Sequence, residues 1–296
     1  MSLDDIRKAI DDNLENVPDE LFNAVEREQR LLFIEISALL DELEVAEGQI
    51  VTSQANIIKV QQINEKINAL LFGQDSTYVQ ALIKYGKGMK VQSELTKSYF
   101  KELLGEFENK PIYDDVVKAA QTTAIDALTQ DAINSAFNQP LKNILNQSVS
   151  TGVKKSEAVE SLRQFVQGGE FNGNPVDGKL IKYVKQVARD GFSVADRQLV
   201  KTIATDLEME WWIYGGSVVK DSRKFCKDRV GKYFHSKEVE GWAALDWQGK
   251  APVNEGTIFI ILGGYNCLHT ALPVIAEMVP KEVIQRNIQN GNYEPK

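Results

Sequence analysis

The amino-acid sequence predicts an α+β protein: a long-helix, mainly α N-terminal region followed by a small mixed α+β C-terminal domain. Apolar residues keep a helical spacing up to about residue 210. All four tryptophans lie beyond that point, among short β-rich segments that Gly, Pro and Asn turns separate. We therefore divide the chain into a helical region at 1–167, a loop and connecting helix at 168–210, and an α+β motif domain at 211–296. We expect β structure only at about 211–275.

The composition bounds the class of protein. With 296 residues, 43% hydrophobic and 26% charged, the chain resembles soluble globular proteins. No apolar run approaches the ~20 residues that cross a bilayer, so we expect no membrane partner. The acidic start, MSLDDIRKAIDDNLENV, lacks the apolar core of a signal peptide. Two cysteines cannot form a secreted disulfide framework, which favours a reducing compartment.

Charge is distributed unevenly along the chain. The formal net charge is −8, and residues 1–72 hold 15 acidic but only 6 basic side chains. Affinity for nucleic acid depends mainly on Lys and Arg, so we expect DNA contact to be at most indirect. Solvated acidic helix faces account for these charges.

A long apolar pattern runs between Pro18 and Pro111 without an intervening proline. From Leu32 to Leu71 apolar residues follow a 4–3 spacing, which predicts a helix about 60 Å long. Gly48 is the weak point, where we expect a kink or a break. A bundle helix with neighbours in the same chain is the favoured interpretation, because further apolar residues widen the stripe. Self-association through the long helices is the alternative.

Later segments are punctuated by glycine and proline. Pro140 is expected to precede a helix, and KKSEAVESLRQFV is predicted to be a short helix that Gly168 ends. The Gly-rich segment 168–179 is predicted to be a loop. A helix is expected from Lys179 towards Glu210, and TIFIIL, residues 257–262, is predicted to be a strand.

Both cysteines and both histidines of the chain fall between residues 226 and 269, as Cys226, His235, Cys267 and His269. This set of four suits tetrahedral Zn²⁺, although its spacing is not that of a zinc finger. Structural Zn²⁺ is therefore the candidate cofactor, with His235 the weakest ligand because it directly precedes an expected helix N-cap at Ser236. The alternative is a small core of buried thiols with a hydrogen-bonded His269.

Patterns for catalysis are weaker. The segment GGYNCLH, residues 263–269, lacks the Lys-Ser/Thr of a phosphate-binding loop. Cys267 and His269 lie too close in sequence to favour a nucleophile–base pair. We therefore assign no catalytic residue and expect a protein that is not an enzyme.

Two segments, residues 214–242 and 262–274, resemble the C-terminal domain of the Mu F-like phage head morphogenesis, or minor head, proteins. The match covers roughly the last third of the chain and has one departure, Leu268, which stands where the family usually has Arg. The residues that carry the resemblance are Arg223, Phe225, Cys226, Gly231, Lys232, Tyr233, Trp242, Gly263, Gly264, Tyr265, Asn266, Cys267, His269, Pro273 and Val274.

The resemblance implies a minor structural protein of a tailed-phage head that acts in procapsid assembly next to the portal. It implies the portal or major capsid protein as partner and the virion as location, after synthesis in the host cytoplasm. In some phages such a protein enters the cell with the DNA. The alternative is a head-packaged enzyme, either a metal-dependent nuclease or an effector-type transferase.

Overall fold

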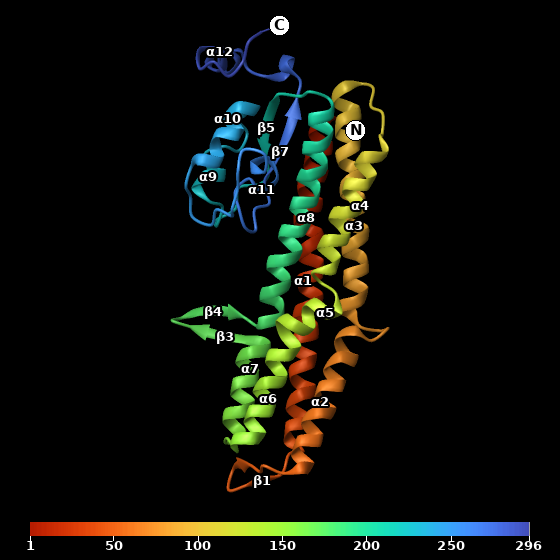
Figure 1. Ribbon diagram of the computed structural model, residues 1–296, viewed down its shortest axis with the longest axis vertical. Coiled ribbons are helices and arrows are strands. Elements are labelled where there is room, and N and C mark those ends of the chain that lie inside the picture. The colour runs from red at the N-terminus through yellow and green to blue at the C-terminus, as the bar shows by residue number, and fades with distance from the viewer. Residues whose placement is uncertain (296) are drawn as a thin grey trace. The chain divides into compact units, whose positions relative to one another are not determined.

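The computed structural model describes residues 1–295 and is dominated by helices, shown in Figure 1. The α-helices are α1 (Leu3–Asp41), α2 (Gln54–Phe72), α3 (Thr77–Leu104), α4 (Pro111–Asp126), α5 (Gln130–Ile133), α6 (Gln139–Thr151), α7 (Lys155–Gln167), α8 (Lys179–Asp206), α9 (Lys224–Lys227), α10 (Ser236–Gly241), α11 (Ile258–Ile261) and α12 (Lys281–Gln289). The strands are β1 (Val45–Ala46), β2 (Gln49–Ile50), β3 (Gly168–Phe171), β4 (Asn174–Asp177), β5 (Trp211–Gly215), β6 (Tyr233–His235) and β7 (Thr270–Val274). None of the helices within residues 1–295 has the length and apolar character that a membrane span requires.

The chain forms two compact units, each assembled from separate stretches of sequence. The sheet unit contains Met1–Pro18, Gly86–Ala124 and Ala188–Lys296, and the helical unit contains Asp19–Tyr85 and Ile125–Val187. These units differ from the three consecutive segments that the sequence predicts. Helices α1, α3, α4 and α8 each contribute residues to both units. The start of α1 therefore belongs to the same unit as the C-terminal segments.

The apolar pattern at residues 32–71 forms two helices, so the prediction of one long helix is wrong. Glu47 and Gly48 have positive φ values of 51° and 79° and turn the chain between β1 and β2. The buried Asn56 side chain stabilises this turn by bonding the backbone of Glu44 and Val51. The break thus lies at the predicted weak point, Gly48. The chain can leave the helix there because the β1–β2 hairpin and Asn56 bond the backbone N–H and C=O groups that the helix no longer pairs.

In the helical unit, apolar faces from several helices form the core. Helix α6 packs against both α2 and α7. Core residues include Leu21, Val25, Ile63, Ile67, Leu141, Leu145 and Leu162. The favoured interpretation of a bundle helix with partners in its own chain is confirmed for this part of the pattern.

The glycine-rich segment after α7 is a hairpin, so the predictions of a loop here and of β structure only at about 211–275 are both wrong. Strands β3 and β4 pair antiparallel, with Gly168 opposite Asp177 and Phe171 opposite Asn174. Asn172 and Gly173 turn the chain with φ values of 51° and 77°. An Asn-Gly pair of this conformation matches the twist of a two-residue hairpin, which is why the segment pairs with itself.

The sheet unit combines helices with a three-stranded antiparallel sheet in the order β6-β5-β7, which confirms the α+β class. Figure 1 shows β5 and β7 beside the later half of α8. The Tyr99 hydroxyl of α3 donates a hydrogen bond of 2.6 Å to the carbonyl of Pro273 in β7. The small sheet is thus anchored to helices that precede it by more than a hundred residues.

Residues 258–261 form helix α11, so the prediction of a strand at TIFIIL is wrong. The Asn254 side chain accepts a hydrogen bond of 3.0 Å from the Thr257 backbone and starts the turn. Ile258 and Phe259 are buried, and the Phe259 ring lies 4.7 Å from that of Trp212. Tertiary packing thus overrides the β propensity of this short apolar run.

Helices α1 and α3 approach closely at Gly88 of the sheet unit. A Cβ at this position would lie 2.4 Å from Cγ1 of Val17. We expect Gly88→Ala to lower the free energy of unfolding by about 1–3 kcal/mol, because the crowded helices must separate. Chemical denaturation measures this loss. The double variant Gly88→Ala/Val17→Ala is the control and should recover part of it; equal loss in both variants would contradict this packing.

Asp196 of α8 is a buried acid that bonds a hydroxyl of α3. Its Oδ1 accepts a hydrogen bond of 2.7 Å from the Thr96 hydroxyl, and burial raises the pKa of its carboxyl. Because the folded pKa is raised, this group supports folding below pH 3.8, the usual pKa, and the support is lost as pH rises through the folded pKa.

Asp196→Asn keeps the acceptor for Thr96 and removes the ionisable group. We expect it to raise Tm by a few degrees at pH 7, with a gain that shrinks as the pH falls towards 4. Thermal melts between pH 4 and pH 8 check this expectation. A gain that grows on acidification would contradict the sign of the shift.

Candidate functional site

The first residue of the candidate site is Cys226, which helix α9 positions. The carbonyl of Arg223 accepts the Cys226 backbone N–H at 3.0 Å, which starts this single helical turn. Cys226 is buried, and the Tyr214 hydroxyl of β5 donates a hydrogen bond of 3.4 Å to its sulfur. The hydroxyl thus gives this buried sulfur a polar partner.

The second segment is a tight turn that leads from α11 to β7. Leu262, Gly264 and Asn266 have positive φ values of 46°, 93° and 55°. Gly263 lies against the sulfurs, because a Cβ there would be 2.6 Å from Cys226 Sγ and 2.8 Å from Cys267 Sγ. The two glycines therefore have separate roles. Gly264 adopts the positive φ that the tight turn requires, and Gly263 leaves space for the two sulfur atoms.

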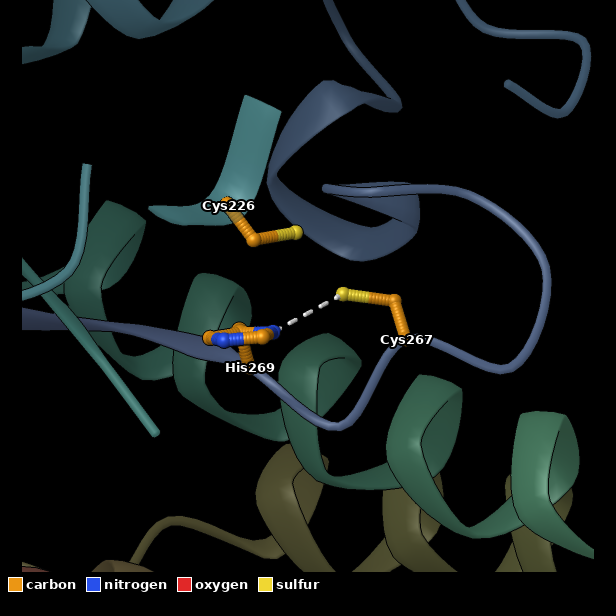
Figure 2. A group of neighbouring side chains, drawn as sticks. All are labelled: Cys226, Cys267 and His269. Carbon is orange, nitrogen blue, oxygen red and sulfur yellow. Dashed lines mark hydrogen bonds between the residues drawn. The ribbon is translucent and has the colours of Figure 1, made fainter. Parts of the chain in front are cut away.

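Cys226, Cys267 and His269 converge at this turn, as the sequence predicts. One ligand atom from each of the three buried residues lies within 4.8 Å of the other two. Figure 2 shows the Cys267 sulfur directed at the His269 ring, with Sγ and Nδ1 3.7 Å apart, while the Cys226 sulfur lies above both. Both cysteines are free thiols. These atoms make up the thiol-imidazole cluster, the name used below for Cys226, Cys267 and His269.

His235 does not join this cluster, contrary to the expectation that it supplies a fourth ligand. It is the N-cap of α10, where its Nδ1 accepts the Lys237 backbone N–H at 3.3 Å and Glu238 bonds its own N–H. The expected cap at Ser236 is therefore one residue too late. An imidazole nitrogen that caps a helix at the end of β6 is not available to the cluster.

Arg197 of α8 holds the cluster through the backbone carbonyls of its turn, a role that the sequence pattern did not predict. The buried guanidinium donates hydrogen bonds to the carbonyls of His269 at 2.6 and 2.9 Å, of Ile260 at 3.0 Å, and of Cys267. The sequence contained a signal for it. Phe192, Asp196 and Val200 follow the four-residue spacing of the apolar stripe, so a charged side chain stands among the apolar positions. Arg197 directly follows that charged residue.

The electrostatics of the cluster favour one ionised thiol. The pKa of Cys267 lies well below its usual value because Cys226 donates a hydrogen bond to it, and the charges of Arg197 and His269 act in the same direction. The pKa of Cys226 is raised because its proton is held between the two sulfurs. A thiolate at Cys267 is the form that binds metals and acts as a nucleophile.

A pocket of about 670 Å³ reaches the thiol-imidazole cluster from the surface. Cys226, Cys267 and His269 all line this pocket. The charged side chains in the wall are mostly basic: Arg189, Lys220, Arg223 and Lys224, with the single acid Asp221. Leu268 also lies in this wall. The pocket therefore favours an anionic ligand.

The remaining motif residues hold these segments together. Arg223 donates to the carbonyls of Gln248 at 2.9 Å and Tyr265 at 2.6 Å, which ties the α9 segment to the turn. Phe225 and Trp242 pack in one aromatic cluster with ring centroids 5.6 Å apart. Gly231 turns the chain with a φ of 76° before β6, and the Asn266 backbone N–H bonds Asp190.

The comparisons with known proteins add no relative: no family model, no curated protein and no solved structure matches this chain.

Proposed function

We propose that this chain is a minor structural protein of a tailed-phage head and acts in procapsid assembly next to the portal. The observation that supports the proposal is the joining of the two Mu F-like segments into one closed module. Arg223 from the first segment bonds the carbonyl of Tyr265 in the second, and Gly263 of the second accommodates the Cys226 sulfur of the first. The residues that carry the resemblance thus depend on one another.

In this proposal, the helices dock on the portal or the major capsid protein. Helix α1 offers a face for docking in the helical unit, where Leu31 and Ile34 are 47% and 60% exposed. The two residues are three apart and therefore neighbours on one helix face. Apolar side chains exposed on an otherwise acidic segment are suited to a protein partner.

Incorporation into heads tests this proposal. The full-length chain is co-expressed with the portal and major capsid proteins of its phage, and its copy number in purified heads is measured by quantitative mass spectrometry. We expect Leu31→Asp/Ile34→Asp to reduce the copy number about tenfold, because two charges must be desolvated at the interface. The matched control is Val176→Asp, at an exposed apolar residue of the β3–β4 hairpin.

Wild-type protein absent from the heads would contradict the assembly role, and normal incorporation of the α1 variant would contradict docking through this face. A deletion of residues 1–150 is a poorer test. It removes Met1–Pro18 and Gly86–Ala124 from the sheet unit and so disrupts the motif domain as well.

A head-packaged enzyme is the second candidate, favoured by the basic pocket that reaches the thiol-imidazole cluster. Of its two forms, the nuclease is the simpler to test. Purified protein with Zn²⁺ or Mg²⁺ should then nick supercoiled DNA, and Cys267→Ser should abolish nicking. Cleavage that persists in Cys267→Ser would exclude the cluster as its source.

A further inference from the structure

The spacing of the three ligand atoms fits one metal ion. Tetrahedral zinc holds sulfur at ~2.3 Å and imidazole nitrogen at ~2.0–2.1 Å, which places two ligand atoms about 3.5–3.8 Å apart. The Cys267 Sγ and His269 Nδ1 are 3.7 Å apart, and no pair in the cluster exceeds 4.8 Å. Side-chain shifts of less than about 1 Å therefore bring all three atoms to zinc distances.

The surroundings of the cluster support charged ligands better than an apolar thiol core. The Tyr214 hydroxyl donates to Cys226, and Arg197 donates to the carbonyls of Cys267 and His269. Such contacts orient the residues that hold a metal and balance the charge of two thiolates. A small core of buried cysteines needs neither a buried guanidinium nor an imidazole.

His269 presents Nδ1 to the sulfur atoms, 3.7 Å from Cys267 Sγ. Its other ring nitrogen, Nε2, is buried and has no hydrogen-bond partner among the residues described. Nδ1 is therefore the nitrogen that is placed to bind a metal.

We propose that Cys226, Cys267 and His269 bind one Zn²⁺ through the two sulfur atoms and Nδ1, with the fourth position open to the basic pocket. Three protein ligands plus one open position are typical of zinc sites that hold a water or an exogenous ligand. Lys220 and Lys224 in the lining of this pocket favour an anion at that position. This site is independent of the proposed role in head assembly.

Metal content is the first test. Full-length protein purified without chelator should contain one zinc per chain by plasma mass spectrometry. Cys226→Ser, Cys267→Ser and His269→Gln should each lose it. His235→Asn is the matched control, since asparagine preserves the helix cap and His235 lies outside the cluster. Loss of zinc in this control, or retention in the cluster variants, would overturn the ligand assignment.

Cobalt substitution keeps the proposal testable if the cluster variants fail to fold. Wild-type protein in which Co²⁺ replaces Zn²⁺ should show thiolate-to-cobalt charge-transfer bands and the visible bands of four-coordinate cobalt. Metal-free protein with two titratable thiols, or a disulfide detected by intact mass, together with no cobalt spectrum, would overturn the proposal.

The open position is tested with inorganic phosphate. Its addition to the cobalt protein should shift the visible bands, and Lys220→Glu should weaken this binding on the order of tenfold, because one attractive charge in the pocket becomes repulsive. Lys237→Glu, an exposed residue that does not line the pocket, is the control. A cobalt spectrum that phosphate leaves unchanged would show that the fourth position is closed.

Discussion

Replacement of Gly263 by alanine is expected to lower Tm by about 5–10 °C and to abolish the zinc binding proposed for the thiol-imidazole cluster. The added Cβ would lie 2.6 Å from the Cys226 sulfur and 2.8 Å from the Cys267 sulfur, so the two cysteines must move apart. Gly263 does not have the positive φ found at Gly264, so the expected loss comes from crowding alone. Differential scanning calorimetry and zinc analysis on the same sample measure both effects.

Gly241→Ala is the matched control for this substitution. No atom lies within 4 Å of a Cβ at Gly241, and its φ of −61° is helical. Alanine there should leave Tm unchanged or raise it slightly, because alanine favours a helix by up to about 1 kcal/mol over glycine. A Gly263→Ala protein as stable as this control would show that the sulfurs do not converge on Gly263.

Arg197→Met is expected to lower the free energy of unfolding by roughly 3–5 kcal/mol. Methionine preserves much of the side-chain volume but leaves the carbonyls of Ile260, Cys267 and His269 without their buried donor. The turn that carries Cys267 and His269 then loses its attachment to α8. Urea denaturation measures the loss, and hydrogen exchange of residues 260–270 should rise more than that of the helical unit.

Arg197→Lys distinguishes the effect of the positive charge at this position from the effect of the several hydrogen bonds that the guanidinium donates. Lysine retains the positive charge but cannot direct donors at three carbonyls at once, so we expect it to recover only a minor part of the stability. Full recovery would mean that the charge alone matters. Wild-type stability in Arg197→Met would contradict the role of the guanidinium in holding the cluster.

Much of the local structure could be predicted from the chain itself. Helix α7 and its end at Gly168 follow from the apolar spacing and the glycine, and α8 begins at Lys179 as expected. The change of character at Trp211 marks the first strand of the three-stranded sheet. The convergence of Cys226, Cys267 and His269 was also predictable, because residue types rare in this chain gather around one turn.

Tertiary packing decided the features that the sequence pattern left ambiguous or misjudged. Helical periodicity continues across Gly48, yet the chain breaks there because Asn56 satisfies the backbone of a hairpin. The β-branched run at Ile258 becomes helical because Phe259 packs on Trp212.

The candidate site shows the same division. Spacing alone suggested four ligands, but His235 caps α10 and Arg197 enters from a helix seventy residues away. The sequence determined which side chains are present to form the site, and it determined the turn that positions Cys267 and His269. Only the tertiary structure determined which groups meet, because a buried donor such as Arg197 is selected by the carbonyls left unpaired when distant segments pack together.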